Sequence, residues 1–299
     1  MRFKPTRHTV YIGDVRTTLS ALEEACVQLV VTSPPYGSLK DYDHPEQIGF
    51  KHGYEDYLSE LEKVWRECLR ALEPGCKLVI NVGDQFFRGT EKQKYSVLPI
   101  QADTITICRR LGFETLGSII WKKVSTTKTS GGGVWMGSIY YPRDGYVTYE
   151  HEYILLFRKP GAYRQPSREM KALSKLTKEQ RSLWFRGIWE LTPARQNGHC
   201  AMFPYELPER IIRMFSFAGD TVLDPFSGSG TTLQAARDWG RNSIGIELNP
   251  AFVPLMRERI GEVEETEEGE LKDERGNRYV LCGAEWSKHT DGIQMTLRI

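Results

Sequence analysis

Segments of apolar, β-branched residues alternate along the chain with segments of helical periodicity. Residues 8–14 and 27–32 have the composition of short strands, and residues 15–25 between them have the spacing of an amphipathic helix. Two prolines follow the second strand and stop it. A strand, a helix and a strand in this order favour parallel pairing, so the sequence predicts an open α/β sheet with helices on its faces.

The same alternation continues to about residue 260. A helix at 54–72 would place one apolar stripe against the sheet, formed by Tyr57, Leu61, Val64, Trp65, Cys68 and Leu72. Glu73-Pro74-Gly75 ends this helix, and a buried strand follows at 77–84. The remaining expected elements are helices at 100–111, 204–217, 231–239 and 250–260, strands at 116–123, 152–159, 221–224 and 242–247, and a small hairpin around 275–277.

Composition excludes several classes of protein. The 299 residues include 40 Lys and Arg against 39 Asp and Glu, and 40% are hydrophobic, which is typical of a globular protein and not of disordered, collagen-like or disulfide-stabilised chains. No apolar run approaches the roughly 18 residues of a membrane span, and the first residues lack the apolar stretch of a signal peptide, so we expect a cytoplasmic protein with no membrane partner. The six cysteines show neither a C-x-x-C pair nor zinc-ligand spacing, which predicts reduced thiols and no metal.

The near-zero net charge conceals two segments of opposite sign. Residues 121–197 contain 14 Lys and Arg and 6 Asp and Glu, whereas residues 262–274 contain 8 acidic residues and 1 Lys. The basic segment suits a polyanionic partner, and the acidic segment would repel one. Two parts of the basic segment interrupt the α/β alternation: residues 122–149 have the character of a long functional loop, and residues 160–197 are partly helical and match no strand.

A glycine-rich motif, DPFSGSGTT at 224–232, lies between a predicted strand and a predicted helix. Its glycines allow a tight turn and a close approach to a ligand, and the following helix presents unpaired N–H groups. Two phosphate-binding patterns fail, because the Walker Lys is missing and Leu233 stands where G-x-G-x-x-G needs its third glycine. Glu247, after the next strand, is placed to bind both hydroxyls of a ribose. The motif therefore indicates a nucleoside ligand, with a plain strand-to-helix turn as the alternative.

A second motif, Ser33-Pro34-Pro35-Tyr36, follows the predicted strand at 27–32. Successive prolines fix the backbone and remove two N–H donors, so the local carbonyls and the Ser33 hydroxyl present acceptors without competing donors. Such a site suits an amino group, and the Tyr36 ring offers a flat face on which a base can stack. The alternative is a rigid turn that ends a strand. Both motifs follow presumed parallel strands, where open α/β sheets bind ligands.

Together these motifs resemble those of the beta-class DNA amino-methyltransferases, in which the catalytic motif precedes the S-adenosylmethionine motif. The resemblance extends from about residue 10 to about residue 260 and includes GDVRTTL, HEYILLFRK, HCAMFPYELPERII and GIELNP. It implies a Rossmann-like methyltransferase fold of the α/β class, with a mostly parallel sheet flanked by helices and a circularly permuted motif order. The basic segment, the long loop and the acidic tail fall outside it.

The resemblance also implies S-adenosylmethionine as the cofactor. The cofactor-binding residues that it implies are Asp14, Phe203, Asp224, Phe226, Gly228, Ser229, Gly230, Thr231, Glu247 and Asn249. The glycine-rich turn would hold the methionine end of the cofactor, Glu247 would bind its ribose, and Phe203 would help to close the pocket. A helix N-cap is an equally good interpretation of Asp14. His44 and His199 are better explained as structural residues.

The implied reaction is direct transfer, in which the exocyclic amino group of a flipped base attacks the sulfonium methyl without a nucleophilic Cys. The implied catalytic residues are Ser33, Pro34, Pro35 and Tyr36. The Ser33 hydroxyl and the Pro34 carbonyl would accept hydrogen bonds from the amine, and Tyr36 would stack on the base. Because Ser before Pro-Pro-Tyr is commoner among N4-cytosine enzymes, we favour methylation of cytosine N4 in a specific duplex sequence. The alternatives are adenine N6, a non-catalytic nucleic-acid-binding protein, and an RNA or protein methyltransferase.

The basic stretch at 161–197 lies where this family commonly has its DNA target-recognition region. The candidate contacts to phosphates and base edges are Arg164, Arg168, Arg181, Arg186 and Arg195, with a solvated helical face as the alternative. We therefore expect a catalytic half at 1–160, this insert, an S-adenosylmethionine-binding half of the same domain at 198–262, and an acidic tail at 263–299. The expected partners are double-stranded DNA, a second copy of the chain if it is a homodimer and not a monomer, and a companion restriction endonuclease.

Overall fold

The computed structural model describes residues 3–36, 44–49, 53–87, 96–123, 149–193, 203–262, 264–266, 270–282, 285–289 and 292–296. Within these residues, the centre of the molecule is an 11-stranded sheet with the order β11-β12-β13-β1-β10-β9-β2-β3-β7-β6-β8. Its strands are β1 (Arg7–Ile12), β2 (Val27–Thr32), β3 (Leu72–Val82), β6 (Glu114–Lys123), β7 (His151–Arg158), β8 (Ile188–Leu191), β9 (Thr221–Asp224), β10 (Asn242–Glu247), β11 (Glu264–Glu265), β12 (Leu271–Lys272) and β13 (Arg278–Cys282). The described residues also form the antiparallel pairs β4 (Gln85–Phe87) with β5 (Ser96–Leu98) and β14 (Glu285–His289) with β15 (Gly292–Thr296).

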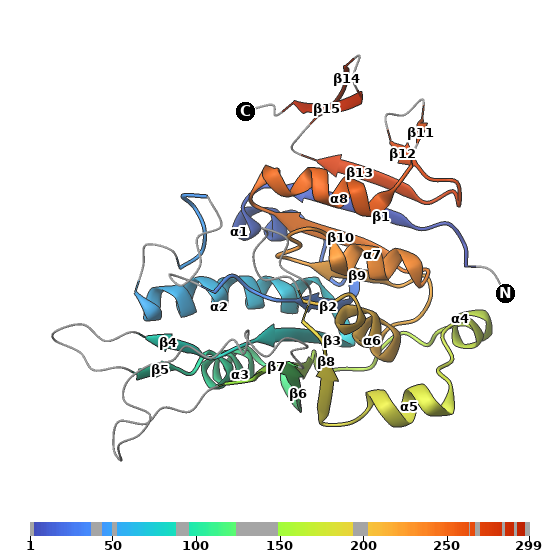
Figure 1. Ribbon diagram of the computed structural model, residues 1–299. Helices are drawn as coiled ribbons and strands as arrows, with labels where there is room; N and C mark the ends of the chain where they lie inside the picture. Colours follow the sequence, from blue (N-terminus) through green and yellow to red (C-terminus); the bar gives the residue numbers. More distant parts are fainter. Residues whose placement is uncertain are drawn as a thin grey trace.

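Helices cover both faces of this sheet (Figure 1). One face carries α1 (Val15–Thr18), the 3₁₀ turn η1 (Leu19–Ala21), α2 (Tyr54–Ala71) and α3 (Ile100–Leu111). The other carries α6 (Glu206–Phe215), α7 (Thr231–Asp238) and α8 (Val253–Ile260), the last preceded by the 3₁₀ turn η3 (Pro250–Phe252). The connection from β7 to β8 contains α4 (Arg168–Leu173) and α5 (Lys178–Trp184).

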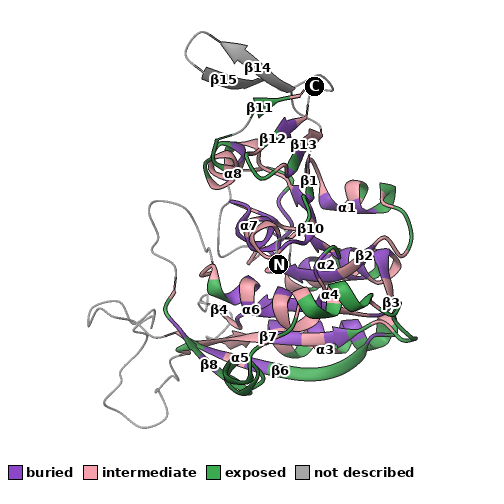
Figure 2. Ribbon diagram, turned by 90° about the vertical axis from the view of Figure 1, so that its right-hand side faces the viewer, coloured by how far each residue is buried: buried purple, intermediate pink, exposed green. Residues whose placement is uncertain are grey.

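The core lies between the sheet and its two helical layers. Successive side chains of a strand point to opposite faces, so β2 feeds two hydrophobic clusters at once. Val30 packs in the cluster that contains Trp65 of α2, whereas Leu29 and Val31 pack in the cluster that contains Ile211 of α6. Burial on both faces explains why the middle of this strand, Leu29-Val30-Val31, is apolar at successive positions. Figure 2 shows the buried residues concentrated in the strands between the helices.

The central strands β13, β1, β10, β9, β2 and β3 are mutually parallel, and β7 is antiparallel to both of its neighbours, β3 and β6. β2 pairs directly with β9, with Leu29 opposite Val222 and Val30 opposite Leu223. The Ser-Pro-Pro-Tyr and glycine-rich motifs therefore begin side by side at the carboxyl ends of the parallel strands, although they are far apart in the sequence. The predicted α/β architecture, with a mostly parallel sheet and a permuted motif order, is confirmed.

Two local predictions were wrong. Residues 188–191, predicted to match no strand, form β8 and pair in parallel with β6, because four residues with two buried side chains are too few to show a strand period. The helix predicted at 15–25 ends after α1 and η1. The hydroxyls of Thr17 and Thr18 bond to the Asp14 carbonyl, and such side-chain bonds compete with a continuing helix. The described part of the chain contains no helix that is long and apolar enough to cross a membrane.

The predicted hairpin around residues 275–277 is present, and its second strand, β13, extends the main sheet beside β1. A buried polar cluster fastens it. The Asn277 side-chain oxygen accepts hydrogen bonds from the Thr6 backbone N–H at 2.9 Å and the Thr6 hydroxyl at 2.8 Å. The His8 ring lies 2.7 Å from the hydroxyl oxygens of both Thr6 and Ser243, and burial lowers its pKa to about 3. The neutral imidazole is thus part of the packing between β1, β10 and β13.

Asn277→Ala should lower the free energy of unfolding by about 2 kcal/mol, because it leaves the buried Thr6 N–H without its acceptor. Urea denaturation at pH 7 measures this difference. Arg275→Ala, in the exposed turn of the same hairpin, is the control and should change the free energy by less than about 0.5 kcal/mol. Equal stability of the two variants would contradict the role given to Asn277.

Candidate active site

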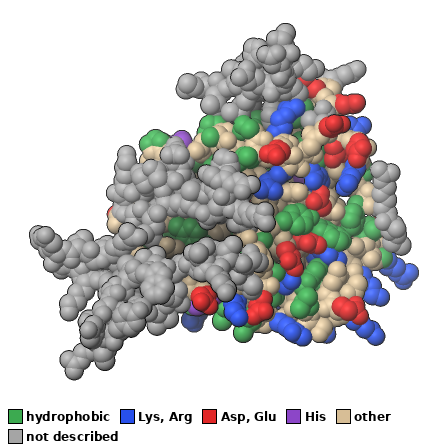
Figure 3. All heavy atoms as spheres, in the orientation of Figure 1, with side chains coloured by type: hydrophobic (Ala, Val, Ile, Leu, Met, Phe, Trp, Pro, Cys, Tyr) green, Lys and Arg blue, Asp and Glu red, His purple; other side chains and the backbone are tan. Residues whose placement is uncertain are grey.

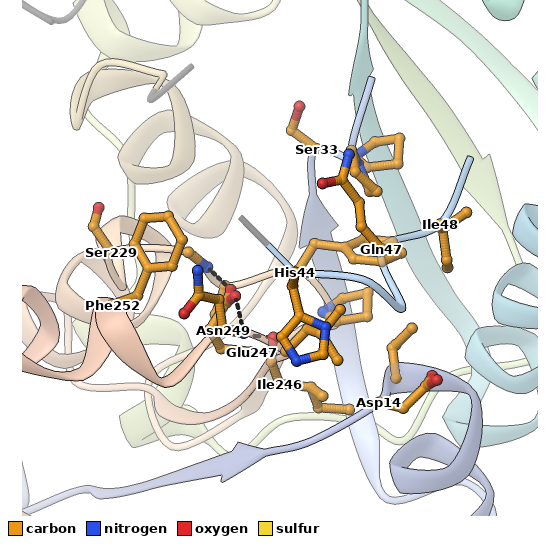
Figure 4. A pocket seen from close by; sticks show the side chains of 18 of the residues that line it. Asp14, Ser33, His44, Gln47, Ile48, Ser229, Ile246, Glu247, Asn249 and Phe252 are labelled. Carbon is orange, nitrogen blue, oxygen red and sulfur yellow. Dashed lines mark hydrogen bonds between the residues drawn. The ribbon is translucent and has the colours of Figure 1, made fainter. Parts of the chain in front are cut away.

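A cavity, partly open to solvent, lies where β1, β2, β9 and β10 end. The sequence-predicted residues that line it are Asp14, Ser33, Pro34, Pro35, Tyr36, Phe203, Phe226, Gly228, Ser229, Thr231, Glu247 and Asn249. Figure 4 shows Ser33 with Gln47 on one side of this cavity and Glu247 with Asn249 on another. The two sequence motifs thus contribute to a single site.

The glycine-rich turn is held against β10 by backbone bonds. The Ser227 N–H donates to the Ile246 carbonyl at 2.9 Å, and the Gly230 N–H donates to the Ser227 carbonyl at 2.8 Å. Gly228 has a φ of 50°, a left-handed conformation that favours glycine, and a Cβ placed there would meet no atom within 4 Å. The space beside Gly228 is therefore open for a ligand.

Glu247 is oriented by the same turn. Its two carboxylate oxygens accept hydrogen bonds from the Gly228 N–H at 2.7 Å and from the Asn249 N–H at 2.9 Å. Each oxygen keeps a further lone pair, so the carboxylate can also accept two hydroxyl donors from a ligand. Burial raises the pKa of Glu247 to about 7. The charge of this group therefore changes near neutral pH.

Asp224 and Gly230 lie behind the cavity and are absent from its lining. The buried Asp224 carboxylate accepts hydrogen bonds from the Thr32 hydroxyl at 2.7 Å and from the Phe226 N–H at 3.1 Å. Burial raises its pKa to about 6, and the hydrogen bonds that it accepts oppose that rise. A Cβ at Gly230 would stand 3.2 Å from the Met256 side chain. Both residues therefore support the turn on the side away from the cavity. Asp224 bonds to Thr32 of β2, and Gly230 allows α8 to pack closely.

Asp14 is both a helix N-cap and a residue of the cavity wall, the two interpretations that the sequence allowed. Its side chain caps α1 by accepting a hydrogen bond from the Arg16 N–H at 2.8 Å, and it also lines the cavity. Burial alone would raise the pKa of Asp14, but hydrogen bonds from Arg16 hold it below its ordinary value. Arg16 in turn donates to Glu60 of α2 at 2.8 Å. The capping carboxylate is therefore ionised and fixed.

Several lining residues were missed by the sequence analysis. His44, interpreted as structural, lies in the cavity wall together with Gln47, Ile48 and Phe252. Gln47 and Ile48 are buried although they belong to an irregular connection. No periodicity or motif marks residues 44–49, so a single sequence carries no signal for them. Phe252 follows the GIELNP segment, and its position just after Glu247 is the only hint.

The arginines predicted to contact DNA lie in different places. Arg164 is 3.9 Å from Glu73 at the start of β3, and Arg168 begins α4, whose Glu169 contacts Lys4 ahead of β1. Both are thus at the amino-terminal edge of the parallel strands, opposite the cavity. Arg181 and Arg186 are exposed on and after α5, beside the last strand of the sheet. Arg195 and His199 lie outside the described residues.

Residues 27–258 match the sequence model of the DNA methylase family, which comprises N6 and N4 methyltransferases. The chain belongs to this family. It is therefore an S-adenosylmethionine-dependent DNA amino-methyltransferase, as the resemblance predicted. The cavity fits this cofactor, because it combines open space beside Gly228, a carboxylate with free lone pairs at Glu247, and the apolar rings of Phe226 and Phe252. Within the described residues, no three His, Cys, Asp or Glu side chains gather in an arrangement that would hold a metal ion.

This methyltransferase is similar to relatives along most of its length. M.MjaI, a type II methyltransferase of Methanocaldococcus jannaschii, is 36% identical over 288 residues, which cover 86% of this chain and 92% of the relative. M.MthZI of Methanothermobacter thermautotrophicus is 37% identical over 284 residues, 86% of this chain and 77% of the relative. The protein TTHA0409 of Thermus thermophilus, named as a DNA modification methylase and solved with S-adenosyl-L-methionine, is 40% identical with a TM-score of 0.69, covering 92% of this chain and 99% of that one. The cytosine-N4-specific PvuII DNA methyltransferase shares the fold, with a TM-score of 0.63 at 22% identity over 89% of this chain and 93% of that one.

The affinity for S-adenosylmethionine should rise with pH through the pKa of Glu247. Below about 7 the carboxyl is protonated and loses acceptors for the ribose hydroxyls, so affinity should be about tenfold weaker at pH 6 than at pH 8. Isothermal titration calorimetry across this range measures the dependence. Glu247→Gln cannot ionise and should bind weakly with little change over the range, which separates this residue from groups that titrate on the cofactor itself. An unaltered pH dependence in Glu247→Gln would count against the assignment.

Proposed function

We propose that this enzyme transfers a methyl group from S-adenosylmethionine to the N4 amino group of a cytosine flipped out of duplex DNA. The observation that carries the proposal is the shared cavity, whose wall includes both the Ser33-Pro34-Pro35-Tyr36 turn and the turn around Gly228. A methyl donor held by the second turn would face an amine held by the first. Direct transfer needs only this juxtaposition, because positioning and electrostatics supply most of the acceleration.

Each wall of the cavity has a distinct task in binding the cofactor. Glu247 accepts the two ribose hydroxyls with the lone pairs that Gly228 and Asn249 leave free. The turn at Gly228 and Ser229 approaches the methionine end, and the rings of Phe226 and Phe252 provide apolar contacts. The bound cofactor supplies an electrophilic methyl group on a positively charged sulfur.

The catalytic turn activates the amine by orienting it. An exocyclic amino group is conjugated with its ring and is a poor nucleophile, so acceptors that draw its hydrogens out of the ring plane favour attack. The Ser33 hydroxyl and the Pro34 carbonyl are these acceptors. Because the amine is inside a base pair in duplex DNA, the base must leave the stack, and Tyr36 provides the face on which it is received. No covalent enzyme intermediate forms.

The choice of cytosine rests on Ser33, since the resemblance associates Ser at this position with N4 methylation. Adenine N6 is the competing target. Incubation of duplex DNA with enzyme and cofactor, digestion to nucleosides and mass spectrometry distinguish the two in one run. N4-methylcytosine is the expected product. N6-methyladenine would overturn the base assignment alone, and the absence of any methylated nucleoside would overturn the activity.

Replacements in the catalytic turn should separate amine activation from base capture. Ser33→Ala removes one preorganised hydrogen-bond partner and should slow single-turnover methyl transfer about a hundredfold, with unchanged cofactor affinity. Tyr36→Ala should weaken capture of the flipped base, since stacking is worth about 1–3 kcal/mol, and Tyr36→Phe should largely restore it. Parental rates in both alanine variants would contradict the proposed roles.

We further propose that the enzyme modifies a specific sequence as part of a restriction–modification system. The support is the similarity to M.MjaI and M.MthZI, both named as type II methyltransferases, over most of their lengths. A companion endonuclease with the same recognition sequence is therefore the expected partner. Modification by the enzyme should make DNA resistant to that endonuclease.

DNA should approach the carboxyl edge of the sheet, where the base pocket opens. Of the predicted contacts, Arg181 and Arg186 suit this approach better than Arg164 and Arg168, because α5 leads into β8, which pairs with the carboxyl-terminal part of β6. Gly187, next to Arg186, accepts a hydrogen bond from the Ile120 N–H of β6, which places this end of α5 along the sheet. On the face shown in Figure 3, Lys and Arg side chains are interspersed with Asp and Glu, so overall charge alone does not define a DNA track.

A matched pair of double variants tests this assignment. Replacement of Arg181 and Arg186 by Ala should weaken DNA binding and flatten its salt dependence, by about 0.9 in the logarithmic slope for each phosphate that is no longer neutralised. Replacement of Arg164 and Arg168 by Ala removes the same charge at the far edge and should leave affinity and slope unchanged. Fluorescence anisotropy at several salt concentrations measures both. Equal losses of DNA affinity in the two double variants would indicate a general charge effect. Unchanged affinity in both would show that these arginines of residues 161–193 do not contact DNA.

A further inference from the structure

The two prolines limit the backbone bonding of the catalytic turn. Pro34 and Pro35 carry no N–H group, so neither can donate to the neighbouring strand as a residue of β2 does. Proline rings fix φ but leave the rotation of the following peptide plane open. If this turn is to hold the Ser33 hydroxyl, the Pro34 carbonyl and the Tyr36 ring in fixed directions, it needs a hydrogen-bond donor from another part of the fold.

Tyr57 of α2 supplies such a donor. Its hydroxyl donates to the Pro35 carbonyl at 2.9 Å, and its side chain is buried, with 4% of its surface exposed. The ring stacks on Tyr54, one helical turn earlier, with 6.3 Å between the ring centroids. The Tyr54 hydroxyl bonds elsewhere, because it donates to the Asp103 carboxylate of α3 at 2.6 Å. Burial of the Tyr57 ring and the bond to the Pro35 carbonyl fix the Tyr57 hydroxyl in place before any ligand binds.

We propose that Tyr57 is a positioning residue for methyl transfer, acting through the peptide between Pro35 and Tyr36. The Pro35 carbonyl and the Tyr36 nitrogen belong to one rigid peptide plane, so a hydrogen bond at the carbonyl sets the direction in which the Tyr36 side chain leaves the backbone. This inference rests on the proposed use of the turn for base capture.

The stacked pair Tyr57 and Tyr54 offers a test with a built-in control. Tyr57→Phe keeps the buried ring and removes the hydroxyl that donates to the turn, whereas Tyr54→Phe removes a hydroxyl that bonds to α3. Single-turnover methyl transfer should fall about tenfold in Tyr57→Phe, the loss expected for one hydrogen bond, and stay within about twofold of the parental rate in Tyr54→Phe. Cofactor affinity should be unchanged in both, and the melting temperatures should fall by similar amounts.

A double-variant cycle with Tyr36→Ala identifies the route of the effect. If Tyr57 acts by aiming Tyr36, Tyr57→Phe should change the rate by less than about twofold once that ring is gone. Additive losses, a parental rate in Tyr57→Phe, or an equal loss in Tyr54→Phe would each overturn the inference. N6-methyladenine as the parental product would overturn only the cytosine assignment and leave this test intact, whereas a parental protein that methylates no DNA would overturn both.

Discussion

The parallel pairing of β2 with β9 is the constraint on which the site depends. It places the ends of two strands from opposite halves of the chain next to each other, and the buried Asp224 carboxylate then joins them by accepting the Thr32 hydroxyl and the Phe226 N–H. Burial makes the charged form of Asp224 less favourable, as its raised pKa shows, and the hydrogen bonds that it accepts offset part of that cost. The Asp224 carboxylate thus connects the residue before the Ser33–Tyr36 turn to the start of the glycine-rich turn. A displacement of one turn would therefore disturb the other.

The two halves of the cavity achieve rigidity by different means. The cofactor half is built from consecutive elements, β9, α7 and β10, and Glu247 is oriented by two backbone N–H groups of its own surroundings. The catalytic half depends on distant support, because its prolines cannot donate and α2 must provide the hydroxyl of Tyr57. Both arrangements fix polar groups before ligands arrive, which reduces the ordering that binding would otherwise require.

The sequence was sufficient to predict those helices, strands and turns that show a clear hydrophobic period or a motif. The helix expected at 100–111 is α3, and the two motifs lie at the ends of β2 and β9. A motif does not say which of its residues face a ligand, however, and so Asp224 and Gly230 were grouped with residues of the lining. That distinction depends on strand register and on the close approach of α8.

Other features had no local signal at all. The pocket residues Gln47 and His44 belong to an irregular connection whose path is set by contacts between segments far apart in the sequence. Charge counting identified the basic segment, but it could not show that Arg164 and Arg168 lie at the edge opposite the cavity. For such exposed residues the sequence does not show which edge of the sheet they lie at, because their side chains are in solvent and no pattern of buried residues marks their place.

The place of β1 in the sheet has a consequence for how the chain acquires its structure during synthesis. β1 is made well before its two neighbours in the sheet, β10 and β13. Pairings across such sequence separations form slowly, and until they form β1 exposes unpaired edges on both sides. The nascent chain must therefore keep β1 from aggregating until β10 has been made. A chain terminated before β9 would carry the turn at Ser33–Tyr36 without β9 and β10, and so would lack the opposite wall of the cavity.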